Sequence, residues 1–148
     1  MEIKILEMTL QDFNSIKNIL NSEFDEFWSE KILKEELESK NKKYFVAKEN
    51  GEIVGFAGYM VNPPDFEIMN IVTKKNKRGK GIGTALLNKI IEIAKNNHAE
   101  KIFLEVNEKN IIARKLYEKT GFEEIGRRKN YYNFVDDAII MSKKQNIL

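Results

Sequence analysis

The amino-acid sequence predicts a mixed α/β domain in which helices cover a β-sheet. Segments with strand and helix periodicity alternate along the chain, an Asn-Gly pair joins two strand-like runs, and a glycine-rich turn separates a strand from a helix. The chain has 148 residues, enough for one domain with a hydrophobic core, and 42% hydrophobic with 32% charged residues is an ordinary globular balance. The expected element order is β-α-α-β-β-β-α-β-α-β-β.

The N-terminal segment predicts one strand followed by two helices. Residues 2–8 alternate in the manner of a strand. Thr9 and Asp12 then form a capping-box pattern at the start of a helix. Ser29 is the expected N-cap of the second helix. The apolar residues expected on the inner faces are Phe13, Ile16, Ile19 and Leu20 in the first helix and Ile32, Leu33 and Leu37 in the second.

Three strands are expected next. Residues 43–48 and 52–61 alternate, and Asn50-Gly51 between them favours a tight hairpin because both residues accept positive φ. The run "NPPD" breaks the chain before a strand at 66–73. The remaining elements are expected to be a helix at 84–97, a strand at 101–106, a helix at 108–120 followed by Gly121 as its C′ residue, and strands at 122–132 and 136–143.

Composition excludes several classes of protein. A formal net charge of +2 gives no global field that would indicate nucleic acid. The absence of cysteine excludes disulfides, thiolate metal sites and a cysteine nucleophile, and fits a reducing cytoplasm. The sequence shows neither a signal-peptide pattern nor an apolar run long enough to span a membrane. The single histidine, His98, is a candidate base, although a lone loop histidine usually has no catalytic role.

The glycine-rich turn is the strongest functional signal. Gly79, Gly81 and Gly83 leave backbone N–H groups uncovered just before a helix, where the helix dipole also favours negative charge. The cations near the turn are Lys74, Lys75, Lys77, Arg78 and Lys80. The turn therefore predicts an anion site, and the alternative is a glycine-rich turn with a solvated lysine cluster.

Two familiar phosphate loops compete for this turn. A Walker A loop requires Gly-Lys-Ser/Thr, but Thr84 follows Gly83 directly. A dinucleotide turn requires G-x-G-x-x-G and an acidic residue at the end of the next strand. Glu105 supplies that acidic residue, although the spacing here is G-x-G-x-G and the turn does not follow the first strand.

Residues 78–83, "RGKGIG", match Arg/Gln-x-x-Gly-x-Gly/Ala and resemble the acetyl-CoA signature of the GCN5-related N-acetyltransferases, the GNAT family. The runs "MNIVTKKNKRGKGIGTALL", "LEVNEKN", "ARKLYEKTGF", "RRKNYY" and "DDAIIM" extend the resemblance over roughly residues 66–141. Within the family they resemble most the branch that acetylates the N-terminal alanine of a ribosomal protein. The resemblance implies a single GNAT-type domain over 1–148, with a mixed, mostly antiparallel sheet and helices on both faces.

The resemblance also implies where acetyl-CoA, the acyl donor, would bind. The diphosphate would lie on the turn and the helix start, on Arg78, Gly79, Lys80, Gly81, Ile82, Gly83 and Thr84. The preceding strand would pair with the pantetheine arm through Ile71, Val72 and Thr73, where a backbone N–H could bind the thioester carbonyl. Asn110 matches a further cofactor contact, and its alternative role is a polar residue at a helix N-terminus.

By the same resemblance, Glu105 is the general base and Tyr117 the general acid. Glu105 interrupts an apolar strand near its end, and Tyr117 lies on the following helix. From the residues alone, each has an alternative interpretation. Glu105 could be a surface carboxylate at the end of a strand, and Tyr117 could be an aromatic residue of the core. Glu67, on the neighbouring strand, is a second carboxylate that could act as base or hold a water.

The acceptor side is assigned to Tyr131 and Tyr132 within "RRKNYYNF". Their mixture with cations would also suit stacking on RNA, or simply an exposed strand. The run "EFWSEK" resembles the aromatic segment that borders the acceptor groove in the family. Two departures from the family's pattern are Phe27 and Asn133, each at a position where proline is usual.

The leading hypothesis is direct acetyl transfer from acetyl-CoA to an N-terminal alanine in a ternary complex, since no cysteine could carry an acyl group. The expected partner is the N-terminus of a small-subunit ribosomal protein, with no nucleic acid, membrane or metal involved, and the expected state is a cytoplasmic monomer or weak homodimer. One alternative is a GNAT enzyme acting on a lysine side chain or a small amine. Another is a domain that binds CoA as a sensor or contacts RNA without catalysis.

Overall fold

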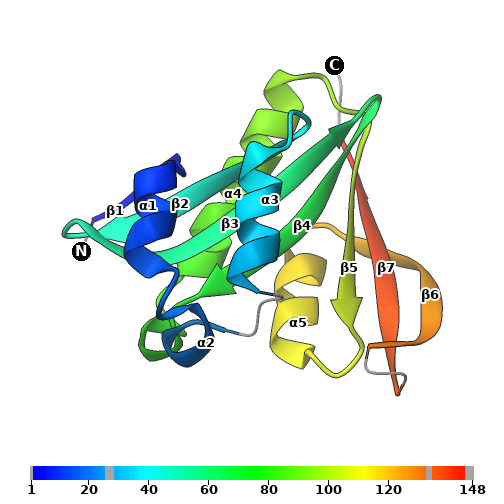
Figure 1. Ribbon diagram of the computed structural model, residues 1–148. Coiled ribbons are helices and arrows are strands. Elements are labelled where there is room, and N and C mark those ends of the chain that lie inside the picture. Colours follow the sequence, from blue (N-terminus) through cyan, green and yellow to red (C-terminus); the bar gives the residue numbers. More distant parts are fainter. Residues whose placement is uncertain (1, 26–28, 133–134, 146–148) are drawn as a thin grey trace.

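A single seven-stranded sheet organises the molecule, in the order β1-β2-β3-β4-β5-β7-β6 (Figure 1). The computed structural model describes residues 2–25, 29–132 and 135–145. The elements are β1 (Ile3–Glu7), α1 (Leu10–Ile16), α2 (Leu20–Glu23), α3 (Glu30–Glu38), β2 (Lys42–Glu49), β3 (Glu52–Asn62), β4 (Asp65–Thr73), a 3-10 turn (Lys75–Lys77), α4 (Ile82–Asn96), β5 (Lys101–Asn107), α5 (Ile111–Lys119), β6 (Glu123–Tyr132) and β7 (Asp136–Lys144).

Strands β4 and β5 form the only parallel pair in the described sheet, and the other neighbours pair antiparallel. Their register is short, because Phe66 pairs with Ile102 and Glu67 with Phe103 and no further pairs follow. Beyond these residues the two strands diverge, and α5 lies beside the point of divergence (Figure 1). The expected mixed, mostly antiparallel sheet is confirmed.

Helices cover both faces of the sheet, as expected. Helices α1, α2 and α3 lie on one face and α4 on the other (Figure 1). Two buried clusters correspond to these faces. The first includes Phe13, Ile16, Leu20, Leu33, Tyr44 and Val46. The second includes Leu86, Leu87, Ile90, Ile102, Leu104 and Ile139, together with Tyr117 and Phe122.

Local signals set most of the element ends. Thr9 and Asp12 form the expected capping box, in which Asp12 N–H donates to Thr9 Oγ1 (3.1 Å) and Thr9 N–H donates to Asp12 Oδ2 (2.9 Å). Asn50 and Gly51 take φ values of 52° and 81° in the β2–β3 turn, and Gly121 after α5 takes 104°. These residues accept the left-handed region more readily than others, so the predicted turn and helix stop are confirmed.

The first predicted helix is divided in the structure. Helix α1 ends at Ile16, a tight turn follows in which Ile19 N–H bonds Ile16 C=O (2.9 Å), and α2 starts at Leu20. The chain then forms a β-bridge between Phe24 and Lys74, at the end of β4. That tertiary pairing changes the direction of the chain, and the helical spacing of apolar residues cannot reveal it.

In the described part of the chain, no helix has the length and apolar character needed to cross a membrane.

Candidate active site

The glycine-rich turn leads directly into α4 and provides an open cradle. Gly79 and Gly81 have φ values of 76° and 81°, and the space where a β-carbon would stand is free of other atoms within 4 Å at both. Gly81 is the N-cap of α4 and makes no side-chain cap bond. The first N–H groups of a helix have no partner within it. They are therefore available to an anion, and the open backbone fits a diphosphate.

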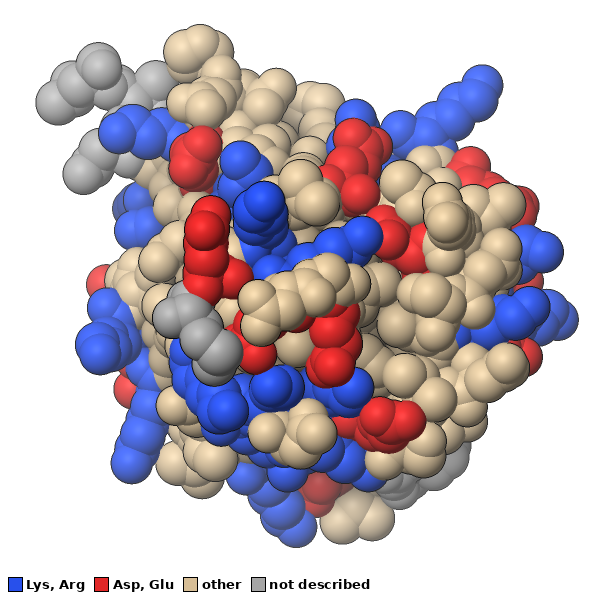
Figure 2. Space-filling model, turned by 90° about the vertical axis from the view of Figure 1, so that its left-hand side faces the viewer, with Lys and Arg blue, Asp and Glu red and all other residues tan. Residues whose placement is uncertain are grey.

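Most of the positive charge near this turn is already paired. Carboxylates hold three of the five expected cations: Lys74 pairs with Glu23 (3.3 Å) and Glu52 (3.1 Å), Lys77 with Glu49 (3.0 Å), and Arg78 with Asp25. The mixture of basic and acidic side chains on this side of the molecule is visible in Figure 2. Lys75 and Lys80 are exposed and form no ion pair with any described residue. Backbone N–H groups therefore matter more for anion binding here than the lysine count suggested.

Strand β4 supplies the segment expected to lie along the pantetheine arm. Ile71, Val72 and Thr73 pair with β3 on one side. On the other side they lie beyond the β4–β5 pairing, which ends at Glu67. The carbonyl of Thr73 accepts a hydrogen bond from Asp25 N–H (2.9 Å), so it is already in use. Val72 directs its backbone groups toward β3, as Lys74 does through its N–H bond to Val54 C=O (2.8 Å). Backbone pairing with an extended ligand is therefore best placed at Ile71 and at the N–H of Thr73.

The two candidate carboxylates lie on neighbouring strands and influence one another. Burial raises the pKa of Glu67, and the negative charge of Glu105 raises it further, while Arg128 and Lys42 act in the opposite direction. Glu105 is held by Arg128, whose Nε lies 3.0 Å from Oε1. The structure therefore brings together both predicted carboxylates, and it adds Arg128.

Arg128 was not predicted as a site residue. It is the second arginine of "RRKNYY", and it lies on β6 with its guanidinium 5.4 Å from the centroid of the Tyr131 ring. One feature of the sequence could have indicated Arg128: it is a basic residue on the same strand as Tyr131 and Tyr132. Nothing in the local sequence, however, indicates that it reaches Glu105 on β5.

Tyr117 is a buried residue of α5, 8% exposed, whose ring packs edge-on against Phe122 with centroids 5.8 Å apart. Burial raises the pKa of Tyr117 to about 12, and Tyr132 contributes to the rise. The core-aromatic interpretation is thus correct for the ring. Tyr132 interacts with both Tyr117 and Glu105, and so links the phenol of Tyr117 to the carboxylates.

An alkaline pH series would test the burial of this hydroxyl. The folded pKa of about 12 exceeds the usual unfolded value near 10, so the associated stability is present below about pH 10 and is lost between about pH 10 and 12. The Tyr117→Phe variant should lose less unfolding free energy over this range, by up to about 3 kcal/mol. Chemical denaturation at several pH values measures this. Burial raises the pKa of Tyr44 more strongly than that of Tyr117, and the pKa values of Tyr59 and Tyr132 are also raised, so these residues should add the same further loss in both proteins. Equal losses would contradict the assignment.

The two tyrosines near the end of β6 have different environments. Their rings meet edge to face, with centroids 5.2 Å apart. Tyr131 is 53% exposed, whereas burial and the charge of Glu105 raise the pKa of Tyr132. Tyr132 therefore belongs to the cluster of Glu105 and Tyr117, while Tyr131 presents a surface to solvent.

The remaining candidates lie at the margins. Asn110 is the N-cap of α5, and its Oδ1 accepts a hydrogen bond from Ala113 N–H (3.1 Å), which matches its alternative role as a polar residue at a helix N-terminus.

His98 is exposed in the loop after α4, beside a separate hollow of about 510 Å³ lined by Phe45, Tyr59 and Pro64 among others. Residues 26–28 and Asn133, where the aromatic segment and one departure were noted, lie outside the described residues. No described group of three His, Cys, Asp or Glu side chains could hold a metal ion.

Comparison with known proteins defines the class to which this fold and site belong. The family model described as "Acetyltransferase (GNAT) family" matches residues 13–122. The chain belongs to the GNAT family and is an acetyltransferase. The acyl donor in this family is acetyl-CoA, as expected from the glycine-rich turn.

The most informative relatives share a more specific activity. The [ribosomal protein bS18]-alanine N-acetyltransferase of Escherichia coli (strain K12) is 33% identical over 120 residues, 78% of this chain and 79% of the relative. A Bacillus subtilis (strain 168) relative, provisionally named for the same enzyme, is 33% identical over 139 residues, 93% of this chain and 92% of its own. The N-alpha-acetyltransferase RimI of Mycobacterium tuberculosis is 31% identical over 112 residues, 73% and 69% of the two chains.

Solved structures agree with this placement. The crystal structure of the ribosomal-protein-S18-alanine N-acetyltransferase from Escherichia coli superimposes with a TM-score of 0.87 at 28% identity, covering 97% of this chain and 94% of that one. A GNAT acetyltransferase from Elizabethkingia anophelis, solved with acetyl-CoA bound, gives a TM-score of 0.75 at 23% identity and covers 97% and 98% of the two chains. The second likeness shows the shared fold.

Proposed function

We propose that this protein transfers an acetyl group from acetyl-CoA to the α-amine of a protein N-terminus, that of an alanine in a small-subunit ribosomal protein. The observation that carries the proposal is the pair of interacting carboxylates, Glu67 and Glu105, on the two strands that diverge after Glu67. Tyr132 interacts with Glu105 and also with Tyr117. Identities of 31–33% to N-terminal acetyltransferases support the acceptor class.

The donor would be held mainly by main-chain groups. Bound acetyl-CoA supplies an activated thioester carbonyl. The N–H groups of residues 79–84 would hold the diphosphate, and β4 would pair with the pantetheine arm at Ile71 and through the N–H of Thr73. A β4 N–H facing the thioester carbonyl would stabilise the negative charge that builds on its oxygen during attack. Arg78 would contribute only if its pairing with Asp25 is exchanged or shared.

Glu105 would receive the proton of the attacking amine, with Glu67 beside it. An N-terminal amine has a pKa near 8, so roughly a tenth is already neutral at pH 7 and the demand on the base is modest. Arg128 occupies Oε1 of Glu105 and leaves the other carboxylate oxygen for the amine or a water. Burial raises the pKa of Glu67, and this carboxylate would accept the proton through water if Glu105 stays paired.

Tyr117 would act chiefly as a hydrogen-bond donor to the departing sulfur. With a pKa of about 12 its hydroxyl stays protonated at neutral pH. Complete proton transfer to a thiolate whose thiol has a pKa near 8.5 would be uphill by roughly 5 kcal/mol. A donated hydrogen bond stabilises the thiolate without that cost. This interpretation weakens the role of general acid that the family resemblance implies.

The acceptor would enter beside β6, along Tyr131 and Tyr132. The absence of cysteine suits a cytoplasmic enzyme and a direct transfer in a ternary complex. A monomer or weak homodimer remains the expected state. Transfer to a lysine side chain or a small amine is the second candidate, and it follows from the 53% exposure of Tyr131, which leaves the outer edge of the site open.

A panel of acceptors tests the proposal. Purified protein with acetyl-CoA should add one acetyl group to a peptide that begins with alanine, as read by intact mass. The same peptide with a blocked N-terminus, lysine-containing peptides with blocked N-termini and a set of small amines serve as matched controls. Transfer to the blocked lysine peptides or to the amines, without transfer to the free N-terminus, would replace this function with the second candidate.

A further inference from the structure

Strand β6 contains an irregularity just before the two tyrosines. Arg128 pairs with Ala138, and the next pair is Tyr132 with Asp136, so that residues 129–131 all lie opposite Asp137. Asn130 within this bulge has a φ of 54°. Asparagine accepts the left-handed region more readily than most residues other than glycine, so this position suits the bulge.

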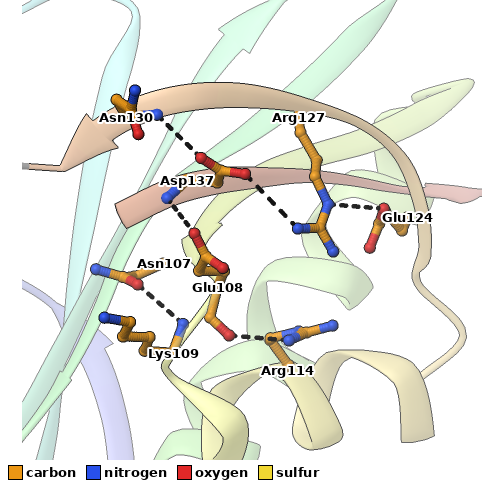
Figure 3. A network of polar contacts seen from close by, with 8 residues as sticks. All are labelled: Asn107, Glu108, Lys109, Arg114, Glu124, Arg127, Asn130 and Asp137. Atoms are coloured by element: carbon orange, nitrogen blue, oxygen red, sulfur yellow. Dashed lines mark hydrogen bonds and ion pairs between the residues drawn. The ribbon is translucent and has the colours of Figure 1, made fainter. Parts of the chain in front are cut away.

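The side chain of Asp137 holds the bulge. Its Oδ1 accepts a hydrogen bond from Asn130 N–H (3.0 Å), and its Oδ2 lies 3.7 Å from Nη1 of Arg127 (Figure 3). Arg127 also pairs with Glu124 (3.3 Å), on the same strand. One carboxylate thus binds both the main chain inside the bulge and the side chain that precedes it.

The main chain of Asp137 is itself fixed to the loop that follows β5. Its N–H donates to Oε2 of Glu108 (2.5 Å), and its C=O accepts from Glu108 N–H (2.9 Å). Arg114 of α5 donates to the carbonyl of Glu108 (2.8 Å) and secures that loop (Figure 3). Asp137 therefore connects the β6 bulge to the end of the strand that carries Glu105.

The bulge lies directly before Tyr132 in β6. It ends at Tyr132, which returns to the β7 register, is half-buried and interacts with Glu105 and Tyr117. We propose that Asp137 is a positioning residue of the acceptor groove: its carboxylate fixes the bulge so that Tyr132 faces Glu105. This inference rests on the proposed acceptor site and adds to it a residue that does not contact the reacting atoms.

Three substitutions test the role of Asp137. Asp137→Ala removes the acceptor of the Asn130 N–H, whereas Asp137→Asn keeps an oxygen in that place. Glu124→Gln is the matched control, because it removes a charge beside Arg127 and leaves the bulge bond intact. We expect Asp137→Ala to raise the KM for an alanine-initiated peptide about tenfold and the KM for acetyl-CoA less than twofold. The other two variants should stay within about twofold for both substrates.

A substitution within the bulge itself tests the same proposal without changing Asp137. Asn130→Val disfavours positive φ without altering Asp137 and should also raise the peptide KM. Amide hydrogen exchange at Asn130 should be faster in Asp137→Ala than in Asp137→Asn, and thermal unfolding reports whether each variant folds. The inference is overturned if peptide KM is unchanged in both Asp137→Ala and Asn130→Val, or if the two substrates' KM values rise together.

Different results would refute the proposed acceptor and the proposed role of Asp137. A wild-type protein that acetylates no peptide refutes the proposed acceptor. If the wild-type protein acetylates the peptide but the peptide KM is unaltered in both Asp137→Ala and Asn130→Val, only the role of Asp137 is refuted. If amide exchange at Asn130 is unchanged in Asp137→Ala, the Asp137 carboxylate does not hold the bulge, whether or not the peptide is a substrate.

Discussion

Glu105→Gln is expected to lower kcat by about 100- to 1000-fold, while the KM for acetyl-CoA changes less than about twofold. The amide keeps the shape of the side chain but cannot take a proton from the attacking amine. It also releases Arg128, which is bound to the carboxylate at 3.0 Å. Steady-state kinetics with an alanine-initiated peptide, at saturating acetyl-CoA, measures the loss.

Glu67→Gln is the matched control for this substitution. It removes a carboxylate of the same kind from the neighbouring strand, next to the same cluster. If Glu105 is the base, Glu67→Gln should cost about tenfold or less, since it changes only a neighbouring charge. A larger kcat loss for Glu67→Gln than for Glu105→Gln would transfer the role to Glu67. Equal losses of kcat and acetyl-CoA affinity in Glu105→Gln would indicate a donor-binding role instead.

Gly58→Ala is expected to destabilise the fold by about 3 kcal/mol or more. A β-carbon at Gly58 would lie 2.4–2.6 Å from three ring atoms of Tyr44, which is 2% exposed. The ring cannot move aside freely, because the Tyr44 hydroxyl donates to Glu36 Oε1 (2.5 Å) and accepts from Asn70 Nδ2 (2.8 Å). Shifting the ring would therefore break buried hydrogen bonds as well as packing.

Thermal unfolding measures this effect. For a chain of this size the midpoint should fall by roughly 6–12 °C. Gly126→Ala on β6 is the matched control, because its β-carbon would meet only Ile140 Cδ1, at an ordinary 3.8 Å, and its midpoint should fall by only about 3 °C or less. If Gly58→Ala and Gly126→Ala have similar midpoints, the contact between Gly58 and Tyr44 does not constrain the fold as the structure indicates.

Several features of the site could be predicted from the sequence because they depend on neighbouring residues. The turn containing Gly79 and Gly81 needs only backbone freedom and a helix that follows, and both are visible in the run of residues 78–83. The roles of Glu105 and Tyr117 came instead from the family resemblance, and they remain proposals. Tyr132 interacts with both Glu105 and Tyr117, which supports a shared site, while the raised pKa of Tyr117 favours hydrogen-bond donation over full proton transfer.

Other features could not be read from the chain because their partners are far apart in sequence. Asp25 pairs with Arg78, a residue on which the family signature depends, from 53 positions away. Asp137 lies 29 positions from Glu108 and 7 from Asn130, and no local pattern connects the three. The periodicity of α1 likewise gave no sign of the break after Ile16, which accompanies the bridge from Phe24 to β4.

The amino-acid sequence alone was enough to predict the α/β class, the hairpin at Asn50-Gly51, the capping box at Thr9 and the glycine-rich turn before α4. These depend on φ preferences, side-chain spacing and hydrogen bonds within a few residues. The folded molecule was needed to show that β4 and β5 diverge after Glu67, that Arg128 reaches Glu105, and that most cations near the turn are paired. These features depend on which distant segments pack together, and that choice is made by burial of apolar surface over the whole sheet.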